Sequence, residues 1–374
     1  MNTVCTRRAV LVSAAVGAVA WQAPAAQAAD QSVGELACRR CGGAGLVPVT
    51  AAKPFVWIEG QAAFRAEEAL VGQPCPICQA PDDRAARIEQ ARVDHEAIVA
   101  QHAEWEERLG GKLLLVQTRH AAIHTQLKLA DAKQAGLALE SLAAALQKSS
   151  SSLALVPTRA ADYQQVLLWG EDAWAKFRRV MESLYTPEQL GENWHTAGKG
   201  TMYDHAEVPH YYFTGKIVRE VPPEYFAVKL AATRQIYLAT GWKAPAWLAE
   251  GFAAYGQHAV LREARVSTIY ALGRGPTRPV SLDEARRLLA GDKLRPWEKL
   301  ISRELRDFEP PDYFQALALV AFLLESQASM FLSLAERLKA GTAVGSALEE
   351  SYKRSLAELE ADGSAWLARR KQLP

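Results

Sequence analysis

The spacing of apolar and polar positions predicts a small sheet followed by a long helical region. Between residues 112 and 185, "KLLLVQTRHAAIHTQL" alternates as a strand does, "AGLALESLAAALQKSSSS" has helical spacing, and "YQQVLLWGEDAWAKFRRVMESLY" contains a strand and then a helix. The glycine-rich stretch "GENWHTAGKGTMYDHAEVPHYYF" predicts a β-hairpin or loop at the edge of a cleft. From Pro222 onward the pattern is helical. We therefore expect an α+β domain over residues 112–374.

Serine and glycine residues mark the ends of two helices in the C-terminal half. "SLDEARRLLAG" and "SLAELEADG" each place a serine three residues before a glutamate, the capping-box arrangement that satisfies the first backbone amides of a helix. Each stretch closes on a glycine, a residue that often terminates helices. The pattern predicts helices that begin after Ser281 and Ser355 and end at Gly291 and Gly363.

A polar helix is predicted as a connector over residues 83–111. "DDRAARIEQARVDHEAIVAQHAEWEERLG" begins with acidic residues, alternates in charge and is followed by a second glycine. His95 and His102 share one face of this helix, which we interpret as solvated. His120 and His124 have even spacing on the strand that follows, where core or cross-strand packing is expected.

The first 29 residues have the features of an export signal. Arg7 and Arg8 precede an apolar run that is too short to remain as a membrane-spanning helix, and Ala26 and Ala28 form an A-x-A cleavage site. The paired arginines are typical of a twin-arginine signal, although an ordinary secretory signal has the same overall pattern. We therefore expect a bacterial protein that is secreted to the periplasm or beyond. It should have no transmembrane segment after cleavage, which also removes Cys5.

The remaining cysteines form two C-x-x-C pairs within residues 30–82: Cys38 with Cys41, and Cys75 with Cys78. Two residues between thiolates allow one turn of backbone to present both sulfurs to a tetrahedral zinc ion. The insert "VPVTAAKPFVWIEG" between the pairs is expected to form a strand hairpin. The pattern indicates a zinc-ribbon-like module with a structural zinc. Disulfides and a thioredoxin-like redox pair are the alternatives.

Composition limits the classes of partner. The chain has 374 residues, 49% of them hydrophobic, which is enough for a large core, and 43 basic residues nearly balance 42 acidic ones. Nucleic-acid binding is disfavoured because it requires a strongly basic surface, and no basic stripe is present.

The stretch "PAWLAEGFAAY", set among these helices, resembles the zinc-glutamate helix of the gluzincin metallopeptidases, particularly the peptidase-MA-like families of exported bacterial proteins. The resemblance runs from about Lys112 to Arg370 and includes the later stretches "YFQALALVAFLLES" and "ALEESYKRSLAELEADGSAWL". It implies that Pro opens the helix, that Trp packs it on the preceding helix, and that Glu250 occupies the position of the third zinc ligand. The residues that carry the match are Pro245, Trp247, Leu248, Glu250, Gly251, Ala253 and Tyr255.

The sequence departs from this family at the other ligands. The family places H-E-x-x-H on the preceding helix, which supplies two histidine ligands and the general base. Here that helix corresponds to "EYFAVKLAATRQIYLATG", which contains no histidine, and the family positions fall near Lys229, Leu230 and Thr233. The ordinary zinc mechanism cannot operate without those ligands, so no catalytic zinc is expected.

A glutamate that once faced zinc needs another cation when it is buried. We expect Glu250 to form an ion pair with Lys229 of the preceding helix, with Arg234 as the second choice. A rearranged metal site, in which His205 and His210 approach Glu250, is the alternative. Cleft residues expected from the sequence are His205, His210, Lys229, Tyr255 and His258.

These observations predict an exported pseudo-metallopeptidase, a pseudoenzyme that binds a peptide or protein without cleaving it. One alternative is a zinc-dependent peptidase with a rearranged metal site. Another is a structural cell-envelope protein whose zinc ribbon is the binding element.

Overall fold

The structure is a computed structural model that describes residues 46–48, 53–74, 83–149, 160–169, 171–187, 202–205, 208–214, 221–265, 279–326, 328–370 and 373. All of these belong to one compact unit that spans residues 38–374. The predicted export signal and all four predicted zinc-ligating cysteines lie outside the described residues.

Six of the described strands form one mixed sheet, in the order β2-β4-β5-β6-β8-β7. The central pairs, β5 with β6 and β6 with β8, are parallel, and the outer pairs are antiparallel. Helices contain most of the remaining described residues, so the predicted α+β class is confirmed. The strands are β2 (Val56–Ile58), β4 (Leu114–Thr118), β5 (Ala122–Thr125), β6 (Gln164–Trp169), β7 (Met202–His205) and β8 (Val208–Thr214).

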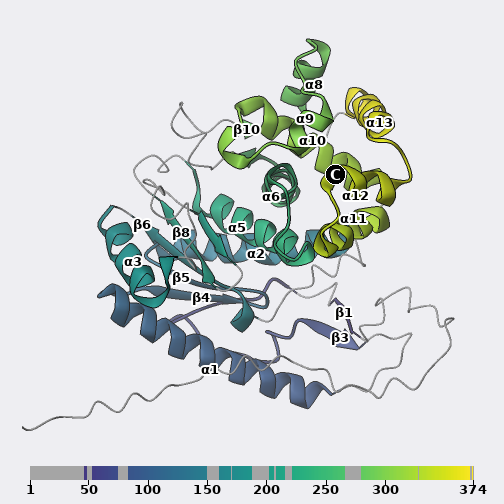
Figure 1. The fold of residues 1–374 in the computed structure, drawn as a ribbon. Coiled ribbons are helices and arrows are strands. Elements are labelled where there is room, and N and C mark those ends of the chain that lie inside the picture. Colours follow the sequence, from purple (N-terminus) through teal and green to yellow (C-terminus); the bar gives the residue numbers. More distant parts are fainter. Residues whose placement is uncertain are drawn as a thin grey trace, which may run out of the picture. The chain divides into compact units, whose positions relative to one another are not determined.

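Helices cover both faces of this sheet (Figure 1). One face carries Val116, Ile123 and Leu167, which pack with α2 (Leu129–Ser149) and α5 (Pro223–Ala239) in the main core. Residues of opposite parity in the strands, such as Leu115 and Val166, face α1 (Arg84–Leu109) and α3 (Glu171–Leu184). Alternation of side chains along each strand thus places one hydrophobic layer on each side.

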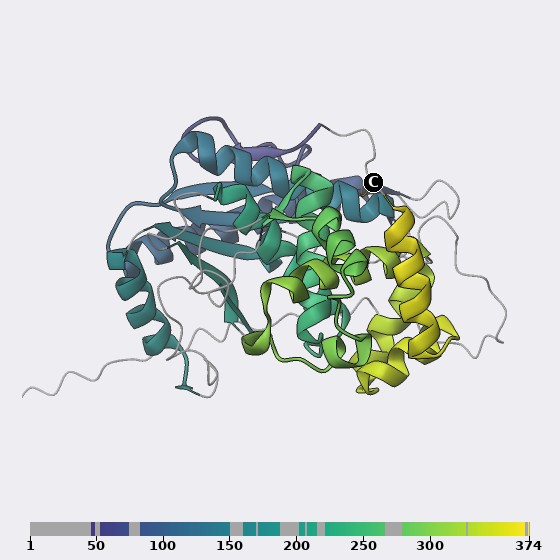
Figure 2. The same cartoon turned by 90° about the horizontal axis from the view of Figure 1, so that it is seen from above.

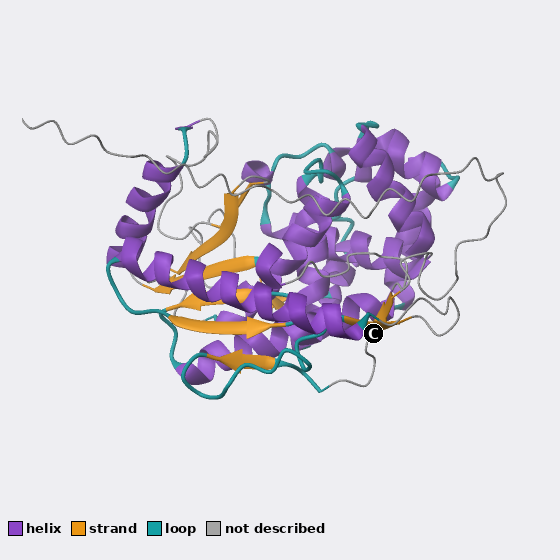
Figure 3. Cartoon of the chain, turned by 90° about the horizontal axis from the view of Figure 1, so that it is seen from below, coloured by secondary structure: helices purple, strands orange, loops and turns teal. Residues whose placement is uncertain are grey.

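The helix α1 is therefore not the solvated connector that its charge pattern predicted. It lies along the sheet (Figure 3) and buries one face formed by Asp94, Ile98, His102, Trp105 and Leu109. These positions follow helical periodicity, but two of them are polar, which weakens the hydrophobic signal. The prediction that the face of His95 and His102 is solvated was wrong, since His102 is only 3% exposed.

Two strand predictions also need correction. The segment around His120 turns, so that β4 and β5 form an antiparallel pair and only His124 lies on a strand. The expected hairpin between the cysteine pairs does not form, because β1 (Leu46–Pro48) pairs with β3 (Gly72–Pro74) while β2 joins the edge of the main sheet. By contrast, β7 and β8 form the hairpin predicted from the glycine-rich stretch.

The C-terminal region is helical as predicted, apart from the short antiparallel pair of β9 (Ala264–Arg265) and β10 (Pro279–Val280). Figure 2 shows its later helices gathered beside the sheet. Among them, α6 packs against α10, and also against the earlier helices α5 and α2. The helices are α6 (Ala246–Leu261), α8 (Leu282–Ala290), α9 (Trp297–Ile301), α10 (Pro310–Ser326), α11 (Ala328–Ala340), α12 (Val344–Tyr352) and α13 (Leu356–Arg369).

The predicted helix starts are confirmed, but one predicted end was wrong. Ser281 accepts a hydrogen bond from the Glu284 amide, and Ser355 forms a complete capping box with Glu358. Gly291 ends α8, whereas Gly363 lies inside α13. A Cβ atom at Gly363 would lie 2.5 Å from the Trp297 ring, so this glycine permits close packing rather than ending the helix.

Among the described helices, none is by itself long and apolar enough to cross a membrane, and α10 with α11 meets that length and composition only as a pair bent by 117°.

Candidate functional site

The candidate site lies where α5 and α6 pack side by side. Pro245 precedes the first residue of α6, as expected from the resemblance, and Pro223 begins α5. Proline suits these positions because the first amides of a helix lack intrahelical acceptors. Trp247 on α6 is completely buried. Its place in the core fixes the first turn of α6 and so sets the direction in which the next turn, with Glu250, faces.

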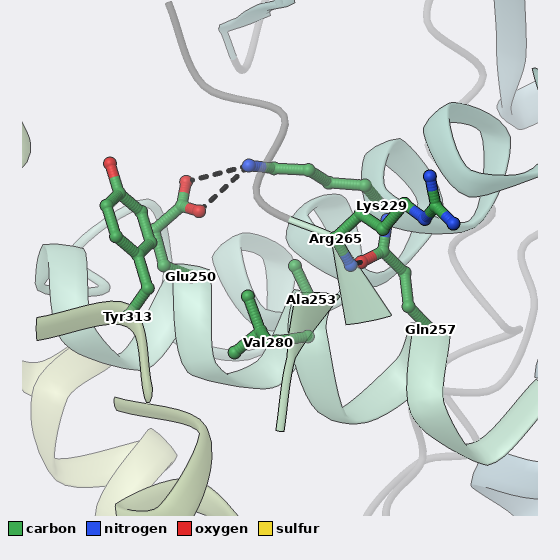
Figure 4. A pocket seen from close by; sticks show the side chains of 8 residues that line it. Lys229, Glu250, Ala253, Gln257, Arg265, Val280 and Tyr313 are labelled. Carbon is green, nitrogen blue, oxygen red and sulfur yellow. Dashed lines mark hydrogen bonds and ion pairs between the residues drawn. The ribbon is translucent and has the colours of Figure 1, made fainter. Parts of the chain in front are cut away.

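Lys229 of α5 and Glu250 of α6 form a buried ion pair (Figure 4). The Lys229 Nζ atom donates to Glu250 Oε2 at 2.8 Å and to Oε1 at 3.1 Å. The two side chains are only 5% and 7% exposed. The predicted pairing is therefore confirmed. The guanidinium of Arg234, the second choice, instead lies over the Tyr163 ring at 4.9 Å.

This pair adds little net stability, although its hydrogen bonds are short. Removing two charges from water costs several kcal/mol per ion, and their attraction at short distance offsets this cost only when the hydrogen bonds are good. Lys229 provides two such bonds, one to each carboxylate oxygen. The pair is therefore tolerated because it is complete, and loss of either partner would leave an isolated charge in the core.

A small cavity of about 10 Å³ adjoins the pair, at the lower limit of the space that can hold one water molecule. Tyr313 stands beside Glu250 in Figure 4, and Gln257 is fixed between two backbone groups. Its side chain donates to the Tyr225 carbonyl at 2.7 Å and accepts from the Arg265 amide at 2.9 Å. The described lining residues are Lys229, Glu250, Ala253, Ala254, Gln257, Arg265, Val280 and Tyr313.

The pKa values of two nearby groups shift because of burial. Burial raises the pKa of Tyr225, and the Glu263 carboxylate raises it further. Burial lowers the pKa of His258, helped by the positive charge of Arg262. Both groups are thereby kept neutral around neutral pH. The acidic and basic side chains among the described lining residues of the cavity are Lys229, Glu250 and Arg265.

The side chains at the positions that the resemblance assigns to zinc ligands do not suit a catalytic zinc ion. Zinc in proteins is bound by histidine, cysteine and carboxylate groups. Here a lysine occupies one position, and both oxygens of Glu250 face its ammonium group. Leu230 and Thr233 are buried, and the Thr233 hydroxyl has no hydrogen-bond partner among the described residues. Within the same ranges, no group of three or more histidine, cysteine, aspartate or glutamate side chains could hold a metal ion.

The other predicted cleft residues fall in different places. Tyr255 is 5% exposed in the main core, and His258 is half-buried near the end of α6; neither contributes to the cavity. His210 lies on β8 opposite Gln165, and His205 lies on β7 opposite Val208. The side chains of these two histidines are outside the described atoms, so a rearranged site that includes them stays a prediction.

Sequence reasoning missed Gln257, Arg265 and Tyr313 as neighbours of the pair. Tyr313 belongs to one of the stretches that carry the family resemblance, but nothing in the spacing of that stretch indicates contact with the cavity. Arg265 lies on the short strand β9, which was expected to be helical. Only the three-dimensional arrangement brings these residues together.

No protein-family model matches this sequence, and no curated protein is significantly similar to it. The resemblance to gluzincins therefore depends on the residues described above.

Proposed function

We propose that the chain is an exported, non-catalytic relative of the gluzincin metallopeptidases that binds peptides or proteins without cleaving them. The observation that carries this proposal is the Lys229–Glu250 pair, because the glutamate that the resemblance assigns to the third zinc ligand is paired with an ammonium group. A lysine supplies the positive charge that the glutamate requires but cannot activate a water molecule as zinc does.

Peptide binding is supported by the hairpin of β7 and β8. The order of the described strands places β7 at one edge of the sheet. An edge strand offers backbone N–H and C=O groups with which an extended peptide can pair. This mode of binding needs neither a metal ion nor a deep pocket, in agreement with the small volume of the cavity beside Glu250.

We also propose that the four cysteines hold one structural zinc ion. The ladder of β1 and β3 pairs Leu46 with Pro74. Cys75 directly follows Pro74, and Cys41 precedes Leu46 by five residues. The start of β1 and the end of β3 thus lie at the same end of the ladder, and each is the end next in sequence to a C-x-x-C pair. This register favours one shared site over two separate ones.

The proposed function is tested with a fluorescently labelled, unstructured polypeptide added to the mature chain, with and without zinc. Anisotropy reports binding, and electrophoresis of the same samples reports cleavage. We expect saturable binding and full recovery of the intact polypeptide, because the ligands for a catalytic zinc are missing.

Two outcomes would contradict the proposal. Chelator-sensitive cleavage that is lost in Glu250→Ala but kept in Glu336→Ala, a change at an exposed glutamate of α11, would establish a rearranged peptidase site. Absence of both binding and cleavage would favour a structural protein. Binding that survives replacement of all four cysteines by serine would favour the large domain over the cysteine site as the binding element.

A further inference from the structure

A pair of buried histidines joins α1 to the sheet. His102 of α1 and His124 of β5 place their Nδ1 atoms 3.0 Å apart, and their rings are stacked with centroids 5.2 Å apart. The residues are 3% and 0% exposed. Two N–H groups cannot face each other at this distance, so a single proton lies between the rings.

Neighbouring amides determine which ring donates that proton. The Gln164 Nε2 group donates to Gln101 and to the Ala161 carbonyl, which leaves Gln164 Oε1 to accept from His124 Nε2 at 2.6 Å. A neutral His124 that donates through Nε2 can only accept through Nδ1. The His102 Nδ1–H group is therefore the donor of the contact between the rings.

The other nitrogen of His102 is placed to take up a proton. His102 Nε2 lies 3.2 Å from Glu59 Oε2 and 3.9 Å from Glu106 Oε1, and neither contact has the geometry of a hydrogen bond. When the His102 ring is neutral and Nδ1 carries its only proton, Nε2 has no proton to donate to Glu59. Lys112 binds Glu106 at 2.9 Å, so the charged groups that face the pair are Glu59, Glu106 and Lys112.

One added proton can be accommodated, but a second cannot. A proton on His102 Nε2 would complete an ion pair with Glu59 and leave the contact with His124 intact. A proton on His124 Nδ1 would place two N–H donors against each other and two positive charges in a buried site. The two rings must then separate, which requires α1 to move away from β5.

We propose that the His102–His124 pair is an acid-sensitive latch, which holds α1 on the sheet at neutral pH and releases it when both rings are charged.

The direction of the pH effect follows from burial. Burial lowers the pKa of His102, against the opposing influence of Glu59 and Glu106. Burial also lowers the pKa of His124, to about 4, although its hydrogen bond to Gln164 opposes this. The released state, with ordinary histidine pKa values, therefore binds more protons than the docked state. The pair therefore contributes its full stabilisation of the docked state above pH 6.5, and this stabilisation decreases as the pH falls toward about 4.

The latch is tested by hydrogen exchange of the full chain between pH 7 and pH 4, corrected for intrinsic exchange rates. Amides of α1 are compared with those of α10, which lies in the main core. We expect the protection of α1 relative to α10 to fall on the order of 100-fold, the factor that the lowered pKa of His124 allows. Constant relative protection would overturn the proposal.

Two variants separate the latch from general acid sensitivity. His124→Gln keeps an acceptor for His102 and a donor for Gln164 but cannot titrate, so it should abolish most of the change in α1. His258→Gln, at a half-buried histidine of α6, should leave the change intact. An unchanged pH dependence in His124→Gln would overturn the proposal.

If His124→Gln does not fold, ring ¹⁵N chemical shifts in the unmodified protein give the same test. The latch requires His124 to be neutral and protonated at Nε2 at pH 7, and both rings to be charged at the pH where α1 opens. Charging of both rings while α1 stays protected would overturn it.

Discussion

The Lys229 ammonium group lies 2.8 Å from a carboxylate oxygen of Glu250, and almost no water reaches either side chain. Each charge is tolerated only because the other is present. The pair therefore acts as a unit, in contrast to exposed ion pairs such as Arg178–Glu182 on α3, whose side chains are 37% and 39% exposed. Solvent screens an exposed pair and makes its partners nearly independent.

A double-mutant cycle measures this difference. We expect Glu250→Gln and Lys229→Met each to lower the free energy of unfolding by about 3 to 5 kcal/mol, since each leaves one buried charge uncompensated. The double variant should lose about 1 to 3 kcal/mol less than the sum of the two changes. Denaturant unfolding of the four proteins gives these values.

The exposed pair provides the matched control. Arg178→Met and Glu182→Gln, alone and combined, should show a coupling of only about 0.3 to 0.5 kcal/mol. Additive effects at Lys229 and Glu250, or equal coupling energies at the two pairs, would mean that burial does not increase the energetic coupling between the two charges.

At the scale of elements, the contact between α6 and α10 sets where Glu250 lies. Every residue of α6 from Trp247 to Gln257 is buried, so the helix has no solvated face there. Gly251 allows the closest approach, because a Cβ atom at this position would lie 2.4 Å from the Ala316 carbonyl oxygen and 2.7 Å from Val320 Cγ2. The backbone of α10 cannot yield as a flexible side chain would.

Gly251→Ala should therefore destabilise the protein by about 1 to 3 kcal/mol through overpacking, despite the higher helix propensity of alanine. Gly345→Ala on α12 is the control, since no atom lies within 4 Å of its Cβ position. This control should raise stability by up to about 1 kcal/mol. Thermal unfolding of both variants tests the contrast, and a neutral Gly251→Ala would mean that α6 and α10 can separate readily.

Local pattern predicted the elements better than it predicted their partners. The α6 helix and its pairing with α5 could be inferred because proline, the apolar run and the family resemblance agreed. The packing of α1 could not be inferred, because His102 and Asp94 lie on its buried face. A hydrophobicity pattern treats both residues as solvent-facing, since their buried partners are not visible in the sequence. Likewise, β1 and β2 are both short apolar segments, and no local signal shows that β1 pairs with β3 while β2 pairs with β4.

At the scale of the whole molecule, the cysteine module is the main untested prediction. We expect one zinc ion per mature chain, measured by elemental analysis. Replacing Cys38 and Cys41 by serine should remove the metal and unfold the module, because zinc binding contributes on the order of 10 kcal/mol to the folding of such a site.

The second cysteine pair makes this test specific. Replacement of Cys75 and Cys78 by serine should remove the same single ion if all four thiolates share it. Retention of zinc in either variant, or intact disulfides in the unmodified protein by mass spectrometry, would contradict the shared site.

The ladder of β1 and β3 has a consequence for the edge of the main sheet. Between these two strands the chain passes through β2, which pairs with β4. The segment from β1 to β3 is thus a loop whose two ends are joined by one ladder, while its middle strand, β2, is paired in another. Docking β2 costs loop entropy that grows with the logarithm of the free length. Any cross-link between the two ends of this loop, whether a metal ion or a disulfide, therefore reduces the entropy that is lost when β2 pairs with β4. The cross-link has this effect although it lies outside β2.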